Sequence, residues 1–336
     1  MPRLSAPRPI SATALDLDAI QQPVAADLKA VDWLIEARLQ SEVALVNRVA
    51  QHIINSGGKR LRPMVVLLSA RAFGYSGAQH IELATIVEFI HTATLLHDDV
   101  VDASTLRRGQ ETANAIFGNE ASVLVGDYLY SRSFQMMVDI ASMRIMEIMA
   151  DTTNLIAEGE VLQLLNCHDP DTGEERYLKV IRSKTAKLFE AAAEVGAVLS
   201  GAAAKHERAV AAYGMHLGTA YQLVDDVLDY RGTSETIGKN VGDDLAEGKP
   251  TLPLIQAMRN GTAEEKAIIR RAIEHGGREA IDQVIAAVES TGAITYTARA
   301  AAAEADMALE ALSEIPPSPY RDALESLAEF CISRTY

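Results

Sequence analysis

The sequence predicts an all-α protein, and the first reason is the placement of its prolines. The chain has 336 residues and 11 prolines, and none of these falls in residues 64–169, 171–249 or 254–315. Proline interrupts helix interiors, whereas alanine and leucine favour them. No segment repeats the alternation of β-branched and polar residues that predicts a sheet. Since only 5% of the residues are aromatic, we expect a helical core built mainly from Ala, Leu, Ile and Val.

The first predicted helix follows an N-terminal arm. Residues 1–24 contain four of the prolines and little apolar periodicity, which indicates a flexible arm. From Val24 to Ile53 apolar residues recur at three- and four-residue steps, and Gly57-Gly58 offers the left-handed conformation at which helices commonly end. Pro63 suits the start of the second helix, which we expect to reach about Phe73.

The remaining elements show the same apolar spacing between glycine and proline breaks. We predict further helices over residues 80–103, 120–150, 150–166, 174–200, 206–230, 251–260, 263–274, 277–290, 293–313 and 319–332, with a less regular stretch over 231–247. No change of composition divides them, so a single helical domain over residues 25–336 is the simplest interpretation. The alanine-rich runs 191–204 and 298–305 fit either closely packed helices or high helix propensity alone.

The composition argues against several classes of protein. A net charge of −15 disfavours a general nucleic-acid binder, which needs a basic face. Two cysteines, Cys167 and Cys331, are too few for a disulfide framework and indicate free thiols in a reducing cytoplasm. The N-terminus lacks the apolar segment of a secretory signal, and no stretch of the chain is apolar enough to span a membrane. We therefore expect a soluble, cytoplasmic protein.

Two acidic motifs each interrupt an apolar helix. Both read DDxxD, at residues 98–102 and 225–229. Residues four positions apart share a helix face, so the first and last aspartate of each motif should lie together. Burying paired negative charges is costly without a cation, and hard divalent cations prefer carboxylate oxygens. A solvated acidic face would explain either motif alone, but two copies in apolar surroundings favour metal binding.

Basic residues beside glycines supply the opposite charge. The segment Gly57–Pro63 places three cations at a glycine turn before a helix, where backbone N–H groups and the helix dipole favour phosphate. Arg107-Arg108-Gly109 follows the first acidic motif, and Lys184, Lys239 and Lys249 come later. Any one of these cations alone would normally be a solvated surface residue. Together they indicate two anionic ligands, one bridged through metal ions and one held directly by Arg and Lys.

These motifs resemble the trans-isoprenyl diphosphate synthase family, in particular its long-chain polyprenyl members. The matching segments are GGKRLRP, LLHDDVVDxxxxRRG and YQLVDDVLDY…GKNVGDDLAEGKPTLPL, and the resemblance extends from about residue 30 to the C-terminus. It implies an all-α bundle around a central cavity, usually a homodimer, with the two acidic motifs facing each other across the cavity mouth. It also implies isopentenyl diphosphate and an allylic diphosphate such as farnesyl diphosphate as substrates. The implied metal is Mg²⁺, three ions per site, with Mn²⁺ as a substitute.

The resemblance assigns roles by matching position. Metal ions would be held by Asp98, Asp99, Asp102, Asp225, Asp226 and Asp229, which with Lys184 and Lys239 would form the catalytic set. The allylic diphosphate would be bound by Arg107, Lys184, Thr185, Gln222, Lys239 and Lys249. Isopentenyl diphosphate would be bound by Lys59, Arg62, His91 and Arg108.

A few residues near the motifs have no assigned role. His97 stands beside the first motif, but packing is a more common role for such a histidine than catalysis. For Asp243-Asp244 a part in capping or supporting the loop is the plainer interpretation. Glu160 and Gln163 are candidates to reach the cavity from their helix.

The implied chemistry needs no side-chain nucleophile, and the sequence shows no Ser/His/Asp or Cys/His arrangement. Metal ions and cationic side chains stabilise the negative charge that develops on the departing diphosphate. The double bond of isopentenyl diphosphate then attacks the allylic carbocation, and in the family a proton passes to the released diphosphate.

Residues before the first motif bear on product length. Thr94 and Ala93 lie about one turn below Asp98, where short-chain members of the family carry bulky aromatic residues that close the cavity floor. A helix of about 25 residues is roughly 38 Å long. That length suits eight to ten partly folded isoprene units of roughly 5 Å each. We therefore predict a product of about C40–C50 for a quinone side chain. Phe134, Met136 and Met137 are candidates for a deeper stop, although core packing is the plainer interpretation of each.

Two other functions fit a similar scaffold. A terpene cyclase or a head-to-head coupling enzyme typically lacks the isopentenyl site, so Lys59 and Arg62 speak against it. A non-catalytic regulatory subunit tends to lose one acidic motif, whereas both are intact here.

Overall fold

The structure, a computed structural model, describes residues 16–231, 242–276 and 278–333, and within these ranges it confirms the all-α fold. The helices are α1 (Leu17–Gln21), η1 (Gln22–Val24), α2 (Ala25–Arg38), α3 (Ala44–Asn55), α4 (Leu61–Ala72), α5 (Gln79–Val101), α6 (Ala113–Phe117), α7 (Asn119–Ile140), α8 (Met143–Asn166), α9 (Glu174–Ile181), η2 (Arg182–Ala186), α10 (Lys187–Leu199), α11 (Ala204–Arg231), α13 (Asp243–Ala246), α14 (Leu252–Asn260), α15 (Ala263–His275), α16 (Ile281–Ser290), α17 (Ala293–Leu312) and α18 (Pro319–Ser333). A short hairpin pairs β1 (Leu106–Arg107) with β2 (Gln110–Glu111) in antiparallel register.

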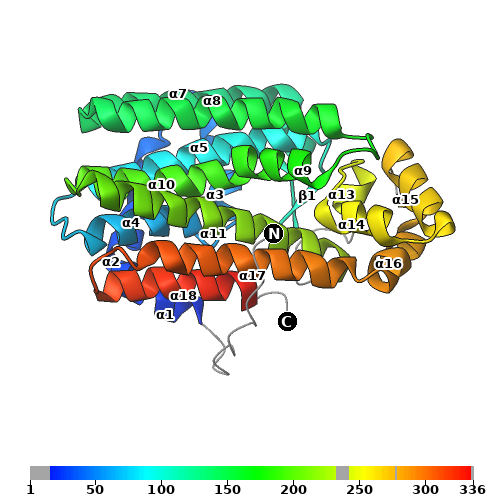
Figure 1. Ribbon diagram of the computed structural model, residues 1–336. Coiled ribbons are helices and arrows are strands. Elements are labelled where there is room, and N and C mark those ends of the chain that lie inside the picture. The colour runs from blue at the N-terminus through cyan, green and yellow to red at the C-terminus, as the bar shows by residue number, and fades with distance from the viewer. Residues whose placement is uncertain (1–15, 232–241, 277, 334–336) are drawn as a thin grey trace.

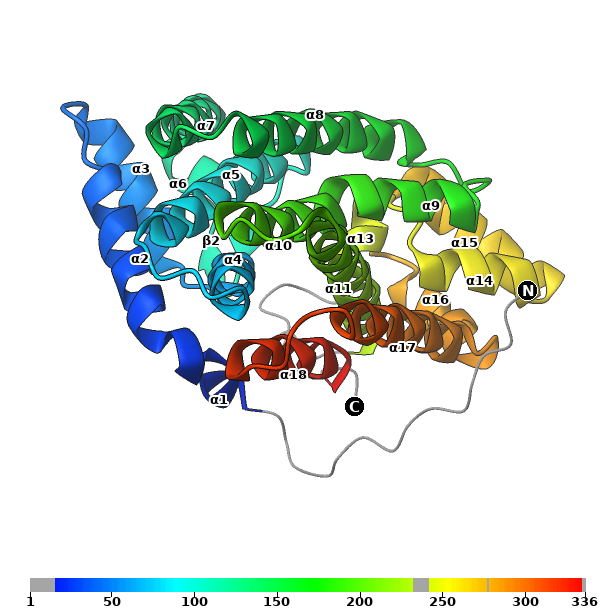
Figure 2. The same ribbon diagram turned by 60° about the vertical axis from the view of Figure 1, so that its left-hand side comes forward.

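The long helices lie side by side, and α13–α16 gather at one end of the molecule (Figure 1). Helix α10 lies at the centre of the bundle, where it packs against α4, α5, α8 and α11 (Figure 2). Small residues permit this packing: alanines 191–193 are fully buried, and a β-carbon on Gly196 would stand 2.7 Å from the Val66 carbonyl of α4. The first alanine-rich run therefore does mark closely packed helices.

Two predicted helices are divided at places that the apolar pattern does not reveal. The expected helix from Val24 to Ile53 is two helices, α2 and α3. The turn between them is held by the Asn47 side chain, which accepts a hydrogen bond from the Ser41 N–H and donates one to the Ser41 carbonyl. The break between α7 and α8 falls at residues 141–142 rather than 150, because Ala141 adopts the left-handed conformation.

The predicted helix over 174–200 is continuous but not uniform. Between α9 and α10 the chain forms the π-helical turn η2, which contains Lys184 and Thr185. Such single π-helical turns within α-helices occur frequently at functional sites.

The folded chain begins earlier than the sequence predicted. We expected a flexible arm over residues 1–24, but α1 and η1 occupy residues 17–24, and Ile20 and Val24 are buried at 4% and 1% exposure. Because α1 packs against the C-terminal helix α18, these apolar side chains gain a partner that local periodicity cannot reveal. The rest of the predicted arm, residues 1–15, lies outside the described residues.

None of the helices in the described ranges has both the length and the low charge that crossing a bilayer requires.

Candidate active site

A cavity of about 620 Å³ brings the acidic motifs and the basic segments together. Its walls come from the turn before α4, from α5 with its hairpin, and from α8, α9, η2, α11 and the segment 243–251. The residues that the sequence singled out on this wall are Lys59, Arg62, His91, Thr94, Asp98, Asp102, Arg107, Arg108, Glu160, Gln163, Lys184, Thr185, Gln222, Asp225, Asp243, Asp244 and Lys249. Asp98 and Asp225 therefore share one opening although they lie on different helices.

Three of the six motif aspartates line the cavity, and three are buried behind its surface. Asp98, Asp102 and Asp225 belong to the wall. The other three are buried, with exposures of 1% for Asp99, 1% for Asp226 and 0% for Asp229. In each motif the second aspartate is turned about 100° around the helix from the first, so it points into the protein rather than into the opening.

The buried second aspartates hold neighbouring groups in place. Asp99 Oδ1 accepts a hydrogen bond from Arg107 Nε at 2.8 Å and lies 2.7 Å from Arg107 Nη2 in an ion pair, which fixes the β1–β2 hairpin against α5. Burial raises the pKa of Asp99, although Arg107 opposes that effect. The loop of the hairpin is Arg108-Gly109, and both residues have positive φ, as a tight two-residue hairpin loop requires.

Asp226 is the corresponding anchor on α11. It accepts hydrogen bonds from the Tyr177 hydroxyl at 2.5 Å and from the Gln222 amide at 2.9 Å. The Thr185 hydroxyl in turn donates to Gln222 at 3.1 Å. Burial, together with the nearby Asp244 carboxylate, raises the pKa of Asp226 to about 7.

The cavity-facing aspartates of α5 are paired with lysines. The Lys184 ammonium lies 3.5 Å from Asp98 and 2.6 Å from Glu160. The Lys249 ammonium lies 2.8 Å from Asp102 and 2.5 Å from Glu247. Burial disfavours both positive charges, but the surrounding carboxylates outweigh it and raise the pKa of each lysine.

The basic turn before α4 forms a second positive region of the cavity. Arg62 stacks over the Phe189 ring at 4.4 Å and donates a hydrogen bond to His91 Nε2 at 3.1 Å. Burial and then the nearby guanidinium groups, Arg62 first, hold the pKa of His91 well below its ordinary value, so the imidazole is neutral and accepts this bond. Arg108 donates to the Gly57 carbonyl, and a β-carbon on Gly58 would stand 2.8 Å from the Arg108 guanidinium. The glycines thus let the hairpin approach the turn.

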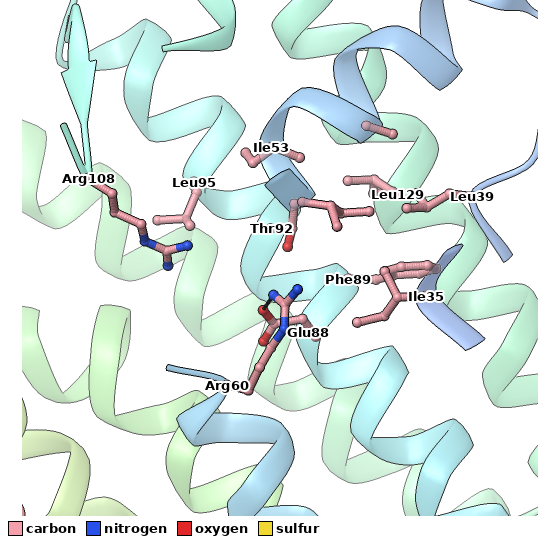
Figure 3. A pocket seen from close by; sticks show the side chains of 12 residues that line it. Ile35, Leu39, Ile53, Arg60, Glu88, Phe89, Thr92, Leu95, Arg108 and Leu129 are labelled. Atoms are coloured by element: carbon pink, nitrogen blue, oxygen red, sulfur yellow. Dashed lines mark hydrogen bonds and ion pairs between the residues drawn. The ribbon is translucent and has the colours of Figure 1, made fainter. Parts of the chain in front are cut away.

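A much smaller pocket adjoins the cavity between α2, α3, α5 and α7 (Figure 3). Its volume is about 10 Å³, which is close to the minimum for one water molecule. Apolar side chains such as Phe89 and Leu129 form most of it, and the Arg60–Glu88 ion pair, 2.5 Å long, belongs to the walls of both spaces. The space between these four helices is therefore too small for more than about one water molecule.

Several predicted residues lie away from the cavity surface. Ala93 is buried at 1% exposure and does not line the cavity, so of the two predicted floor residues only Thr94 does. Met136 and Met137 are core residues. Lys239 falls within residues 232–241 and lies outside the described residues.

Two open questions from the sequence have structural answers. His97 is turned toward α7, where its Nε2 lies 3.2 Å from the Val123 carbonyl and 3.4 Å from Asp127, so it packs rather than lining the cavity. Asp243 and Asp244 do line the cavity, and Asp243 also forms an ion pair with Arg278.

The donor set suits a hard divalent cation bound together with a ligand. Within the described ranges no cluster of three or more His, Cys, Asp or Glu side chains is arranged to hold a metal unaided. Mg²⁺ usually takes one or two carboxylates plus substrate phosphates and water, so a complete protein cage is not required. The carboxylates of Asp98, Asp102 and Asp225 line one opening, beside lysine and arginine side chains that would bind a phosphate. These residues therefore fit a divalent cation that is bound together with a phosphate-bearing ligand.

Tyr177, Glu88 and Glu247 contribute to the site and were missed in the sequence. Tyr177 carries no sequence signal, since its partner Asp226 lies 49 residues away. Glu88 is a lone acid in the apolar run before His91, and a buried acid of that kind predicts a basic partner, here Arg60. Glu247 lies inside the quoted motif DDLAEGKP but had no assigned role.

The all-helical bundle and its charged cavity define a prenyltransferase of the isoprenoid synthase type. The family model described as polyprenyl synthetase matches residues 43–290. The chain is 51% identical over 321 residues to the octaprenyl diphosphate synthase of Escherichia coli (strain K12), covering 95% of this chain and 99% of that one. The chain belongs to the polyprenyl synthetase family.

Other relatives agree in both sequence and structure. Identity is 47% over 316 residues to the all-trans-nonaprenyl-diphosphate synthase (geranyl-diphosphate specific) of Rhodobacter capsulatus, covering 94% of this chain and 97% of that one. A crystal structure of a polyprenyl synthase from Caulobacter crescentus CB15, complexed with calcium and isoprenyl diphosphate, has a TM-score of 0.93 at 44% identity and covers 97% of this chain and 100% of that chain. The resemblance inferred from the motifs is confirmed.

Proposed function

We propose that this protein is a long-chain all-trans polyprenyl diphosphate synthase. It extends an allylic diphosphate such as farnesyl diphosphate by repeated head-to-tail addition of isopentenyl diphosphate, to about C40–C50. The observation that carries the proposal is the single cavity lined by Asp98, Asp225 and the basic turn with Lys59 and Arg62. The octaprenyl and nonaprenyl products in the names of the relatives support the same range of lengths.

The acidic end of the cavity binds the allylic diphosphate. Asp98, Asp102 and Asp225 would hold Mg²⁺, which supplies positive charge to the departing diphosphate. We restrict the proposed metal ligands to these cavity-facing aspartates, because Asp99 and Asp226 are buried against Arg107 and Tyr177. Asp229 is excluded as well, since it is fully buried and does not line the cavity beside Asp225.

Cationic side chains at this end bind the same diphosphate directly. Lys184, Lys249 and Arg107 line the wall beside the acidic motifs and would contact its oxygens. Thr185 and Gln222 complete the wall beside Asp225. These groups are already oriented by hydrogen bonds, so they stabilise the charge as the allylic C–O bond breaks with little rearrangement.

The basic end binds isopentenyl diphosphate. Lys59, Arg62 and Arg108 provide positive charge, and neutral His91 is held by Arg62. Two diphosphates held at opposite ends would bring the isopentenyl double bond toward the allylic carbon, where a C–C bond forms and a proton leaves to the released diphosphate. Holding both substrates in one site lowers the barrier, because the entropic cost of bringing them together is met on binding.

The growing chain would leave the charged region past Thr94. The apolar part of the cavity lining includes Ile156, Val180, Leu188 and Leu95. Because the small pocket of Figure 3 has room for only about one water molecule, the chain would pass on the Thr94 side of α5.

We also propose that two copies associate through α7 and α8, consecutive helices that both lie at one surface of the molecule (Figures 1 and 2). Half of the large apolar side chains exposed on the described chain belong to these helices: Val123, Leu124, Val138, Met143, Leu155, Val161, Leu164 and Leu165. Apolar surface on this scale commonly marks an interface. Neither Cys167 nor Cys331 forms a disulfide, which supports a cytoplasmic enzyme, whose product would serve as a quinone side chain.

The test is incubation of the purified protein with Mg²⁺, isopentenyl diphosphate and farnesyl diphosphate, followed by chromatography of the dephosphorylated products. The expected result is prenyl alcohols of eight to ten units that appear only when both substrates and the metal are present. Hydrocarbon products without consumption of isopentenyl diphosphate would indicate a cyclase instead. No turnover alone but turnover on addition of a second subunit would indicate a regulatory component.

A further inference from the structure

The two cavity-facing aspartates of α5 share one pattern of contacts. Each is paired with a lysine, and each lysine is paired at a shorter distance with a glutamate outside the acidic motif. Lys184 lies 2.6 Å from Glu160 but 3.5 Å from Asp98. Lys249 lies 2.5 Å from Glu247 and 2.8 Å from Asp102. Each ammonium thus stands between two carboxylates, one of which is a proposed metal ligand.

The same pattern is built from unrelated parts of the chain. Glu160 comes from α8 and Lys184 from the π-helical turn η2, whereas Glu247 and Lys249 lie just before α14. All four side chains line the cavity, with exposures between 15% and 28%. Because unrelated segments form the same carboxylate–lysine–glutamate arrangement at both aspartates, the two arrangements are expected to have the same function.

Without a bound metal ion, the negative charges of the acidic motif need another source of positive charge. Asp98 and Asp102 repel each other at close range in a partly buried site, and a cation relieves that repulsion. A bound divalent ion would in turn repel a lysine left beside the same carboxylate. The lysine then needs another anion nearby, or it loses its place on the wall where the diphosphate binds.

We propose that Lys184 and Lys249 occupy the positions of the metal charge in the substrate-free enzyme, and that Glu160 and Glu247 are positioning residues that retain the two lysines when divalent cations bind Asp98 and Asp102. This inference rests on the proposed function, since it takes these aspartates as metal ligands. The glutamates do not touch the reacting atoms. They act through the lysines, so their effect must depend on the lysine being present.

A double-mutant cycle tests this dependence, because it isolates the interaction between two residues. The measured quantity is the binding of Mn²⁺ alone, followed by the loss of its free-ion EPR signal, to wild type, Glu160→Gln, Lys184→Met and the double variant. Glu158→Gln is the matched control: it removes the same charge from the same helix, but Glu158 is exposed and bonds to Asn154. Circular dichroism of each variant without metal checks that the fold is kept.

The expected result is Mn²⁺ binding roughly tenfold weaker in Glu160→Gln, close to the lower end of the coupling found between close charged pairs. Lys184→Met should bind Mn²⁺ more tightly than wild type, and adding Glu160→Gln to it should change binding no more than Glu158→Gln changes the wild type. In turnover assays Glu160→Gln should need more Mg²⁺ for half-maximal rate, with Glu160→Asp restoring part of the loss. Glu247→Gln with Lys249→Met should behave in the same way.

Equal weakening by Glu160→Gln with and without Lys184 would overturn the proposal and indicate that the glutamate binds the metal itself or acts through space. Unchanged Mn²⁺ binding in Glu160→Gln, or no Mn²⁺ uptake by wild type without diphosphate, would also overturn it. The proposed function fails separately, if wild-type protein makes no long-chain product from the two diphosphates. If the wild type is active but the effects of Glu160→Gln and Lys184→Met on Mn²⁺ binding simply add, only the role of the glutamates is refuted.

Discussion

The backbone of Lys184 lies directly against Gly159: a β-carbon at position 159 would stand 2.9 Å from the Lys184 nitrogen and 2.9 Å from the Ser183 β-carbon. This approach brings α8 against the π-helical turn η2, and it sets the next residue of α8, Glu160, beside the Lys184 ammonium. The charged contact therefore depends on the absence of a side chain one position earlier.

Replacing Gly159 with alanine should lower both stability and turnover. In a helix interior the change would normally gain about 1 kcal/mol. Here the neighbours are mainly backbone, and overpacking of this kind costs about 1–3 kcal/mol, so a net loss is expected. Urea unfolding and turnover measure the two effects. Gly173→Ala is the control, since a β-carbon there would meet no atom within 4 Å. If Gly159→Ala is as stable and active as wild type, α8 and η2 can move apart without loss of stability or function.

Alanine at Asp98 or at Asp225 should reduce turnover by several orders of magnitude while the helical circular dichroism stays unchanged. Each change removes a carboxylate that faces the cavity, and neither side chain belongs to the hydrophobic core. Asp306→Ala, at an exposed position on α17 away from the proposed interface, serves as the control and should retain full turnover. Near-normal rates at saturating Mg²⁺ in either site variant would count against the proposed metal site.

The sequence predicted the helices and the shared cavity better than it predicted the roles within each motif. Helical spacing showed that Asp98 and Asp102 share a face, and this is a local property of the chain. Helix geometry also turns Asp226 away from the face of Asp225, but its hydrogen-bond partner Tyr177 is brought there by tertiary packing and leaves no periodic signal. For the same reason the π-helical turn around Lys184 was not predictable, because the close approach to Gly159 that accompanies it is a contact between distant segments.

Tyrosine at Thr94 should shorten the product. Thr94 lines the cavity, and its hydroxyl donates to the His91 carbonyl, so a larger side chain there would project toward the path of the chain. Ala93 is buried, so Ala93→Phe should instead cost about 1–3 kcal/mol of stability through overpacking. Chromatography of the dephosphorylated products gives the length, and Thr94→Ser is the control. An unchanged length in Thr94→Tyr would refute the proposed path.

His91 should make the stability of the substrate-free protein depend on pH. Its pKa in the folded protein lies well below the ordinary value because of burial and the neighbouring guanidinium groups, whereas in the unfolded chain it is about 6.5. Below that pH the unfolded chain therefore binds a proton that the folded protein does not. The contribution to stability is fully present above about pH 6.5 and is lost as the pH falls toward the folded pKa, by up to about 1.4 kcal/mol per pH unit.

The neutral variant His91→Gln isolates this effect. Its free energy of unfolding, compared with that of wild type at about pH 8 and about pH 5.5, should lose about 1 kcal/mol less on acidification. Glutamine can still accept a hydrogen bond from Arg62, which keeps the local contact similar. A difference between the two proteins that stays constant with pH would show that His91 takes up a proton equally in both states.

A glutamate at Leu124 should dissociate the proposed dimer. Leu124 on α7 is 65% exposed, and a charge there would be buried without a partner if a second copy covers this face. Trp33→Glu is the control, because Trp33 on α2 is equally prominent at 69% exposure but lies outside the α7–α8 surface. Sedimentation velocity should find the control as a dimer and Leu124→Glu as a monomer with unchanged circular dichroism. If Leu124→Glu remains a dimer, the copies associate through another surface, and the apolar face of α7 and α8 needs a different partner.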